Sequence, residues 1–155
     1  MNQEYSDSTS LTGDEISQLL DITPPFLMID EIKKIDPGSS AYSVKRLDED
    51  EWFFKCHLHQ ELVMPGTLQI EAMLQTLVLT LYTMEGHKKK TSYITNIKTK
   101  LISKVSPGAP LCIHANLISF KRGIAKGVAV GKINDKTVCQ GEFTFISPHE
   151  ISTPK

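Results

Sequence analysis

The chain has 155 residues, of which 40% are hydrophobic and 23% charged; this is enough for one globular domain and excludes an intrinsically disordered chain. Its 17 Lys and Arg residues balance 18 Asp and Glu residues, which argues against a nucleic-acid-binding protein because such proteins carry a basic surface. No apolar run is long enough to span a bilayer, the polar N-terminus is unlike a signal peptide, and three widely spaced cysteines indicate neither a disulfide framework nor a zinc finger. We therefore expect a soluble, cytoplasmic, single-domain protein.

The N-terminal third is expected to form a tail, one helix and several strands. Residues 1–10 are polar and are expected to be a flexible tail. Thr12 and Glu15 form a capping box, so a helix should begin there and end before Pro24. Apolar runs then predict strands over residues 26–35, over residues 42–47 and from Trp52 onward.

A second helix is expected over residues 67–84, directly after the Met64–Gly66 segment. Its apolar residues leave almost no polar face, which predicts a helix that is buried on most sides. Gly86 supplies a stop signal, and the lysines at positions 88–90 place positive charge after the C-terminal end of the helix.

The remaining residues predict an antiparallel sheet. After the helix, a first strand precedes Pro107; further strands are expected over residues 111–117, 124–133 and 137–146, the last two joined by a tight turn at residues 134–136. A single buried helix with strands on both sides in the sequence indicates an α+β fold in which a sheet wraps around the helix. We expect one domain over residues 11–146 and a C-terminal tail over residues 147–155.

Chemically reactive residues gather between the predicted third strand and the buried helix. His57 lies where that strand is expected to end, and Glu71 lies in the first turns of the helix with Gln75 one turn further on the same face. A carboxylate in a buried helix is costly unless it has a partner or a function. Glu71 and Gln75 could also simply pair with one another, or with solvent at a protein–protein interface.

Two other interpretations of the same segment remain open. In an extended chain His57, His59 and Glu61 share one face and could bind a metal ion, although only His114 is available as a further ligand on a predicted strand. Cys56 beside His57 suggests a thiol nucleophile with a base, but neighbours on a strand point to opposite faces. The two remaining histidines are expected in solvated loops: His87 and His149.

Three runs of residues form a distinctive pattern: Phe53-Phe54-x-x-His57, Val63-Met64-Pro65-Gly66 and Leu68-x-Ile70-Glu71-Ala72-Met73-x-Gln75. In these runs the segment resembles the 3-hydroxyacyl-(acyl-carrier-protein) dehydratases of bacterial fatty acid synthesis, which comprise the FabZ and FabA types, and it is most similar to the FabZ type. The spacing of 14 residues from position 57 to position 71 matches that of the family's catalytic pair. Similar motifs recur at Pro25–Asp30, Pro37–Gly38, Val105–Gly108 and Arg122–Ile124, so the likeness covers residues 11–146.

This resemblance implies a hotdog fold and removal of water from a (3R)-3-hydroxyacyl thioester to give the trans-2-enoyl thioester, with no metal and no cofactor. His57 is expected to be the base, because histidine titrates near neutral pH, and Glu71 to bind and protonate the leaving hydroxyl, because an apolar wall favours a protonated carboxyl group. Gly66, at the helix N-terminus, is expected to donate its N–H to the thioester oxygen. Met64, Pro65 and Gln75 complete the expected substrate-binding residues.

The resemblance also implies partners. The substrate would arrive on an acyl carrier protein, and the enzyme would form homodimers, which can assemble into hexamers, with each site taking its histidine from one subunit and its acid from the other. Because carrier proteins are acidic, the docking surface should be basic. The available cations in the second half of the chain are Lys98, Lys100, Lys104, Lys121 and Arg122.

The sequence departs from the family around His57. The usual Gly-His-Phe-Pro-Gly-His-Pro reads Cys56-His57-Leu58-His59-Gln60-Glu61-Leu62 in this chain, and the usual His-Arg-Tyr before Pro25 reads Ile22-Thr23-Pro24. These differences leave the reaction plausible but favour an unusual acyl chain or a polyketide over the housekeeping pathway. Two alternative functions are a hotdog thioesterase, which the His57–Glu71 pair disfavours, and a non-catalytic protein that binds an acyl carrier.

Overall fold

The computed structural model describes residues 9–87 and 91–150. In chain order its elements are β1 (Thr9–Leu11), α1 (Gly13–Leu20), β2 (Glu31–Asp36), β3 (Ser40–Leu47), α2 (Trp52–Cys56), α3 (Gly66–Tyr82), β4 (Tyr93–Leu101), β5 (Gly108–Lys121), β6 (Ile124–Ile133), β7 (Lys136–Ile146) and a 3-10 turn at Pro148–Glu150.

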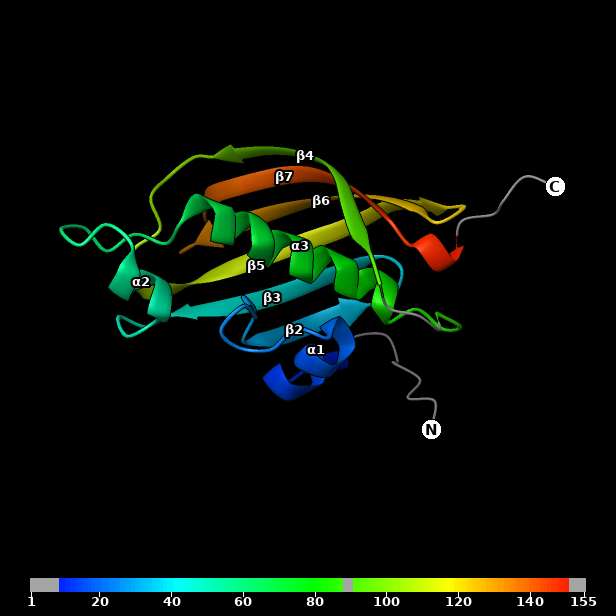
Figure 1. Ribbon diagram of the computed structural model, residues 1–155, viewed down its shortest axis with the longest axis horizontal. Coiled ribbons are helices and arrows are strands. Elements are labelled where there is room, and N and C mark those ends of the chain that lie inside the picture. Colours follow the sequence, from blue (N-terminus) through cyan, green and yellow to red (C-terminus); the bar gives the residue numbers. More distant parts are fainter. Residues whose placement is uncertain (1–8, 88–90, 151–155) are drawn as a thin grey trace.

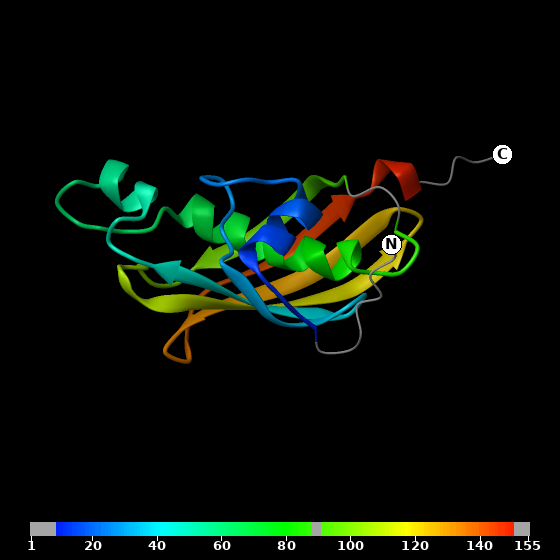
Figure 2. The ribbon, with the colours of Figure 1, turned by 90° about the horizontal axis from the view of Figure 1, so that it is seen from below.

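Seven antiparallel strands form one sheet in the order β1-β2-β3-β5-β6-β7-β4. The helix α3 crosses one face of this sheet, and α1 and α2 lie on the same side (Figures 1 and 2). The predicted α+β arrangement, a sheet wrapped around one long helix, is therefore confirmed. β1 and β4 are the two edges of the sheet within one chain.

The two helices predicted from the sequence form as expected. Thr12 and Glu15 make the reciprocal bonds of a capping box at the start of α1, which ends at Asp21 in the left-handed conformation (φ 55°). Every side chain of α3 from Ala72 to Tyr82 is buried, as the lack of a polar face predicted. Glycine is required at position 127 of β6, where a Cβ atom would lie 2.5 Å from a methyl group of Leu77 on α3 and 2.8 Å from the backbone oxygen of Asn116 on β5.

Two strand predictions were wrong. Residues 26–29 are not in a strand: the chain turns at the two prolines, with Phe26 N–H donating to the Thr23 oxygen, and β2 begins only at Glu31. The segment from Trp52 is the short helix α2 rather than a strand. Phe53 and Phe54 are both buried, and consecutive residues can face one core from a helix but not from a strand, where they alternate.

The C-terminal hairpin is confirmed. Asn134 and Asp135 both have positive φ angles (48° and 63°), which is the geometry of a two-residue turn between twisted strands. The strand β1 was not among the predicted elements, and the predicted charge at positions 88–90 falls outside the described residues. Among the described residues, no helix is long and apolar enough to cross a membrane.

Candidate active site

His57 ends the short helix α2 rather than a strand. It is half-buried, and its Nδ1 lies 2.9 Å from the backbone oxygen of Val63. Because a carbonyl oxygen can only accept, Nδ1 carries the proton, and the neutral ring presents the lone pair of Nε2. The fold therefore supplies an imidazole in the tautomer that can act as a base at Nε2.

Glu71 is held by Gln75, one turn further along α3. The Gln75 amide donates to Glu71 Oε1 (2.9 Å) and to the Phe26 oxygen (3.0 Å), while its own oxygen accepts from the Met28 N–H (2.8 Å). Gln75 is only 2% exposed. It therefore orients the carboxylate and fixes the loop of residues 26–28 at the same time, and it has no amide hydrogen left for a substrate.

The segment between the two residues is fixed by its backbone. Met64 is buried, its N–H donates to the Val105 oxygen (2.8 Å), and its own oxygen accepts from the Gln69 amide (3.4 Å). Gly66 is the first residue of α3, and a Cβ atom there would overlap Leu101 of β4. A larger residue at this position would displace the Leu101 side chain. The N–H of Gly66 is one of the helix's first amides, which have no acceptor within the helix.

Two positioning residues were missed by the sequence interpretation. Gln69 is 3% exposed, and its Oε1 has no hydrogen-bond partner among the described residues. Lys45 is 4% exposed and pairs with Asp30 (3.3 Å) and Glu51 (2.8 Å). Since Glu51 immediately precedes α2, its ion pair with the buried Lys45 ammonium helps to fix the helix that ends at His57.

The alternative groupings do not come together in the structure. His59 and Glu61 are exposed, and Glu61 pairs with Lys104 at 2.6 Å. His114 stacks on Tyr42, with ring centroids 4.3 Å apart. Within residues 9–87 and 91–150, no three His, Cys, Asp or Glu side chains are grouped so that they could hold a metal ion.

The other cysteines and histidines lie outside the segment. Burial raises the pKa of the Cys139 thiol to about 11, whereas Cys56 is exposed. His149 is exposed, as predicted for a solvated residue. His87 was predicted to be solvated as well, but it is half-buried and its ring stacks near Tyr82 with centroids 5.7 Å apart.

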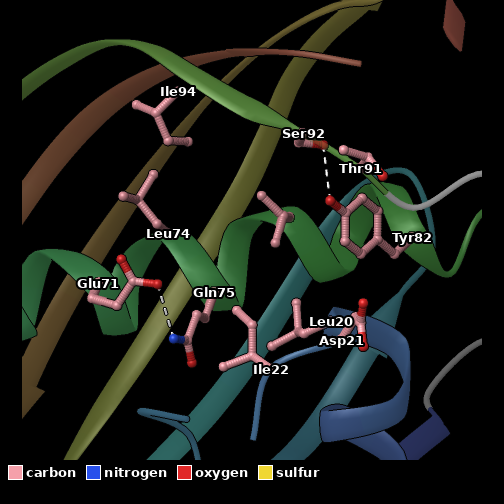
Figure 3. A pocket seen from close by; sticks show the side chains of 11 residues that line it. Leu20, Asp21, Ile22, Glu71, Leu74, Gln75, Tyr82, Thr91, Ser92 and Ile94 are labelled. Carbon is pink, nitrogen blue, oxygen red and sulfur yellow. Dashed lines mark hydrogen bonds between the residues drawn. The ribbon is translucent and has the colours of Figure 1, made fainter. Parts of the chain in front are cut away.

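A groove of about 290 Å³ begins at Glu71 and follows α3 (Figure 3). Its lining comes from the end of α1, from α3 and from the start of β4, and it includes Gln75 but not His57. Of the predicted site residues, the structure therefore brings Glu71 and Gln75 together, and it places His57 with the Val63–Gly66 segment.

The predicted docking cations are all exposed but do not form one patch within a chain. Lys121 ends β5 and Arg122 follows it in the left-handed conformation (φ 53°), whereas Lys104 precedes the other end of that strand. A strand of 14 residues separates the two groups, which is about 45 Å at the usual rise per residue.

Comparison with known proteins identifies the family. Residues 22–142 match the model of the FabA-like domain. The chain belongs to this FabA-like family. It is 33% identical over 138 residues to the 3-hydroxyacyl-(acyl-carrier-protein) dehydratase FabZ of Macrococcus caseolyticus, covering 88% of this chain and 95% of the relative. It is 37% identical over 134 residues to the FabZ of Caldicellulosiruptor bescii, covering 84% and 96%.

A solved structure supports the fold. The dehydratase heterocomplex ApeI:P from Xenorhabdus doucetiae superposes with a TM-score of 0.70 at 13% identity, covering 86% of this chain and 90% of that one. This match confirms the predicted hotdog fold, and the sequence matches confirm the resemblance to FabZ-type dehydratases.

Proposed function

We propose that this protein is a 3-hydroxyacyl-(acyl-carrier-protein) dehydratase of fatty acid or related acyl-chain synthesis. The observation that carries the proposal is the pair of oriented groups in the matching segment: an imidazole whose Nδ1 is held by a backbone carbonyl, and a carboxyl group held by a buried amide. The FabZ name of relatives at 33% and 37% identity supports the same reaction.

His57 is assigned as the base. The reaction must remove a proton from the carbon beside the thioester carbonyl, and the lone pair of His57 Nε2 can accept it. The electron pair moves toward the thioester oxygen, which gains negative charge. The N–H of Gly66, at the positive end of a 17-residue helix, stabilises that charge, with Met64 and Pro65 shaping the approach.

Glu71 is assigned as the acid. When the bond from C3 to oxygen breaks, the departing hydroxide takes a proton from the Glu71 carboxyl group, directly or through a water molecule, and leaves as water. The assignment of Gln75 changes from substrate binding to positioning, because its amide hydrogens already bind Glu71 and the Phe26 oxygen. This scheme uses no metal or redox cofactor.

A second copy of the chain completes the proposed site. β4 is an edge strand of nine residues that leaves large apolar side chains exposed: Tyr93 (58%), Ile97 (46%) and Leu101 (50%). Such an edge is a template for pairing with another strand. Ile94 of the same strand borders the groove at Glu71, so a partner chain paired along β4 would bring its own residues to that groove, and we assign the His57 of each site to the opposite subunit.

The proposed protein partner is an acyl carrier protein, which docks on exposed cations of the second half of the chain. The predicted cytoplasmic location fits such a partner. Assembly of the dimers into hexamers is a further proposal.

The test follows a purified 3-hydroxyacyl thioester by two signals: enoyl absorbance at short wavelength and release of free thiol. Growth of the enoyl signal without thiol supports the dehydratase. Free thiol without enoyl product would establish a thioesterase instead, and neither signal, with the carrier protein bound, would establish a non-catalytic binding protein.

Subunit mixing tests the shared site. In a dimer of one His57→Ala chain and one Glu71→Ala chain, one composite site is intact and the other lacks both groups. Random reassortment makes half of the dimers mixed, so roughly a quarter of wild-type activity should return when the two inactive variants are refolded together. No recovery despite confirmed subunit exchange would place both residues in the site of one chain.

A further inference from the structure

Positive and negative charges are segregated along the chain, although its formal net charge is only −1. Residues 1–87 contain fifteen Asp and Glu residues but only five Lys and Arg residues, whereas residues 91–150 contain eight Lys and Arg residues and three Asp and Glu residues. The strands β5, β6, β7 and β4 come from this second part and lie next to one another in the sheet. One half of the sheet is therefore basic, which the overall charge balance conceals.

Four lysines of this half point away from α3. Side chains alternate between the two faces of a strand. Ala125 of β6 and Phe143 of β7 are 0% and 2% exposed and belong to the core, so the residues next to them face outward. With the strand register, this alternation places the following lysines on the outer face: Lys98 and Lys100 of β4, and Lys126 and Lys132 of β6. Among the described residues of β4 to β7 that face outward, Glu142 is the only acidic side chain.

Two isoleucines lie on the same outer face. Leu117 and Phe120 of β5 both pack against the core, so the two residues between them, at a bulge, point outward. One of these is Ile118, which is 65% exposed, and Ile124 of β6 is 45% exposed two positions before Lys126. A combination of ammonium groups and exposed apolar side chains is typical of surfaces that bind at the headgroup level of a bilayer. The outer face thus offers both charge and apolar contact.

No helix covers this outer face in the part of the chain that the structure describes. Figure 2 shows α1, α2 and α3 together on the other side of the sheet. The groove at Glu71 is lined by residues of α1, α3 and the start of β4, and it lies on the helix side as well. A partner bound to the outer face would therefore leave the groove open to the solution.

We propose that this lysine face binds reversibly to a membrane that contains anionic phospholipids; its members are Lys98, Lys100, Lys126 and Lys132, with Ile118 and Ile124. A soluble polyanion such as a nucleic acid would bind the lysines but gain nothing from the isoleucines. A carrier protein on this face would be separated from the groove by the sheet, and a second lysine face would be repelled by its like charge. A lipid surface fits both kinds of side chain. Pairing of two chains along β4, as proposed above, would join their lysine faces into one.

The charges determine how binding should depend on salt. A lysine close to an anionic bilayer raises the partition coefficient about fivefold. The attraction declines within a Debye length, which is about 10 Å at 0.1 M salt and about 3 Å at 1 M. Binding should therefore be reversible and should weaken steeply as the salt concentration rises.

The test is co-sedimentation of the full chain with lipid vesicles. We expect binding to vesicles of phosphatidylcholine with about 30% phosphatidylglycerol at about 0.05 M salt. Binding should be about tenfold weaker at about 0.5 M salt, and vesicles of phosphatidylcholine alone should bind no protein. Because no substrate is present, the result does not depend on the dehydratase assay. Failure to bind anionic vesicles at low salt would overturn the proposal.

Two double variants test the location of the site. Lys126→Gln with Lys132→Gln removes two charges from the lysine face and should lower the partition coefficient on anionic vesicles about 25-fold. Lys55→Gln with Lys104→Gln is the matched control: it removes the same charge from exposed positions outside this face and should stay within about threefold of the wild type. Urea-induced unfolding checks that both variants are folded. Equal weakening in the two would refute the assignment to this face.

A single exposed isoleucine distinguishes a lipid surface from a soluble polyanion. Ile118→Ser should weaken binding to anionic vesicles several-fold, because its apolar carbons no longer leave water on binding. Ile118→Leu keeps the apolar side chain and should bind like the wild type. A single-stranded oligonucleotide is the competing ligand. If it binds as tightly as the anionic vesicles, and Ile118→Ser leaves vesicle binding unchanged, the partner is a soluble polyanion and the proposal is wrong.

Discussion

Replacing Gln75 with leucine tests whether this buried amide organises the site. The change keeps the size and helix preference of the side chain but removes its three hydrogen bonds, to the Met28 N–H, the Phe26 oxygen and Glu71. Phe26 is exposed, so water can replace one of these partners, whereas Met28 is 1% exposed and its N–H would be left unpaired. A buried unpaired donor costs about 1–3 kcal/mol, so we expect a loss of about 2–3 kcal/mol in the free energy of unfolding.

The assay is urea-induced unfolding of Gln75→Leu, with Gln18→Leu as the matched control. Gln18 lies on the exposed face of α1, and the same substitution there should change the unfolding free energy by less than about 0.5 kcal/mol. Dehydration by folded Gln75→Leu should also fall, through kcat more than KM, because the Glu71 carboxyl group loses its orientation. Equal stability of the two variants, or wild-type kcat in Gln75→Leu, would refute the positioning role.

Three further predictions concern the proposed base, the docking cations and a buried thiol. His57→Ala should lower kcat by about 10²–10⁴-fold in folded protein, the usual contribution of a general base, whereas His59→Ala should retain most activity because His59 is exposed. Steady-state rates measure both variants, with circular dichroism as a check that each is folded. Changing Lys121 and Arg122 together to Glu should raise KM for the carrier-bound substrate but not for a free pantetheine thioester; an equal rise for both would exclude docking there. Burial raises the pKa of the Cys139 thiol from 9.0 to about 11, so its contribution to stability is present below pH 9 and is lost as the pH rises through about 11. Between these pH values, the free energy of unfolding should decline less steeply for Cys139→Ala than for the wild type.

Local signals in the sequence predicted the elements that depend on local physics. The capping box at Thr12 pairs backbone N–H groups, and the turn at Asn134 reverses the chain. Both act within four residues, so both are visible in the sequence itself. The segment at Trp52 misled because two adjacent buried aromatic residues fit either a buried strand or a short helix. The choice depends on Phe53 and Phe54 both joining the hydrophobic core, which is a tertiary effect.

In the candidate site, too, local signals were predicted and long-range contacts were not. His57, Glu71 and Gly66 were found from residue type, spacing and resemblance. The pairing of Gln75 with Glu71 was visible as well, because the two lie one turn apart on a helix. The contacts that join distant parts of the chain were not: Gln75 reaches back 49 positions to Phe26, and Lys45 bridges the loop before β2 to the start of α2. No periodicity in the sequence encodes such pairings, and each becomes visible only when the fold brings its two partners together.

The helix α3 is apolar on two faces, and the sequence alone could not show that each face has its own cause. An amphipathic helix that packs on a sheet needs only one apolar face, yet Leu74 and Val78 are apolar on the side of α3 that borders the groove rather than the sheet. An apolar face of this kind would be an aggregation risk if it stayed exposed to water. This apolar face lies between Glu71 and Tyr82, which both line the groove. The apolar surface of α3 is therefore explained on one face by packing against the sheet, and on the groove side it fits the proposed dimer, in which a partner chain paired along β4 lies next to it.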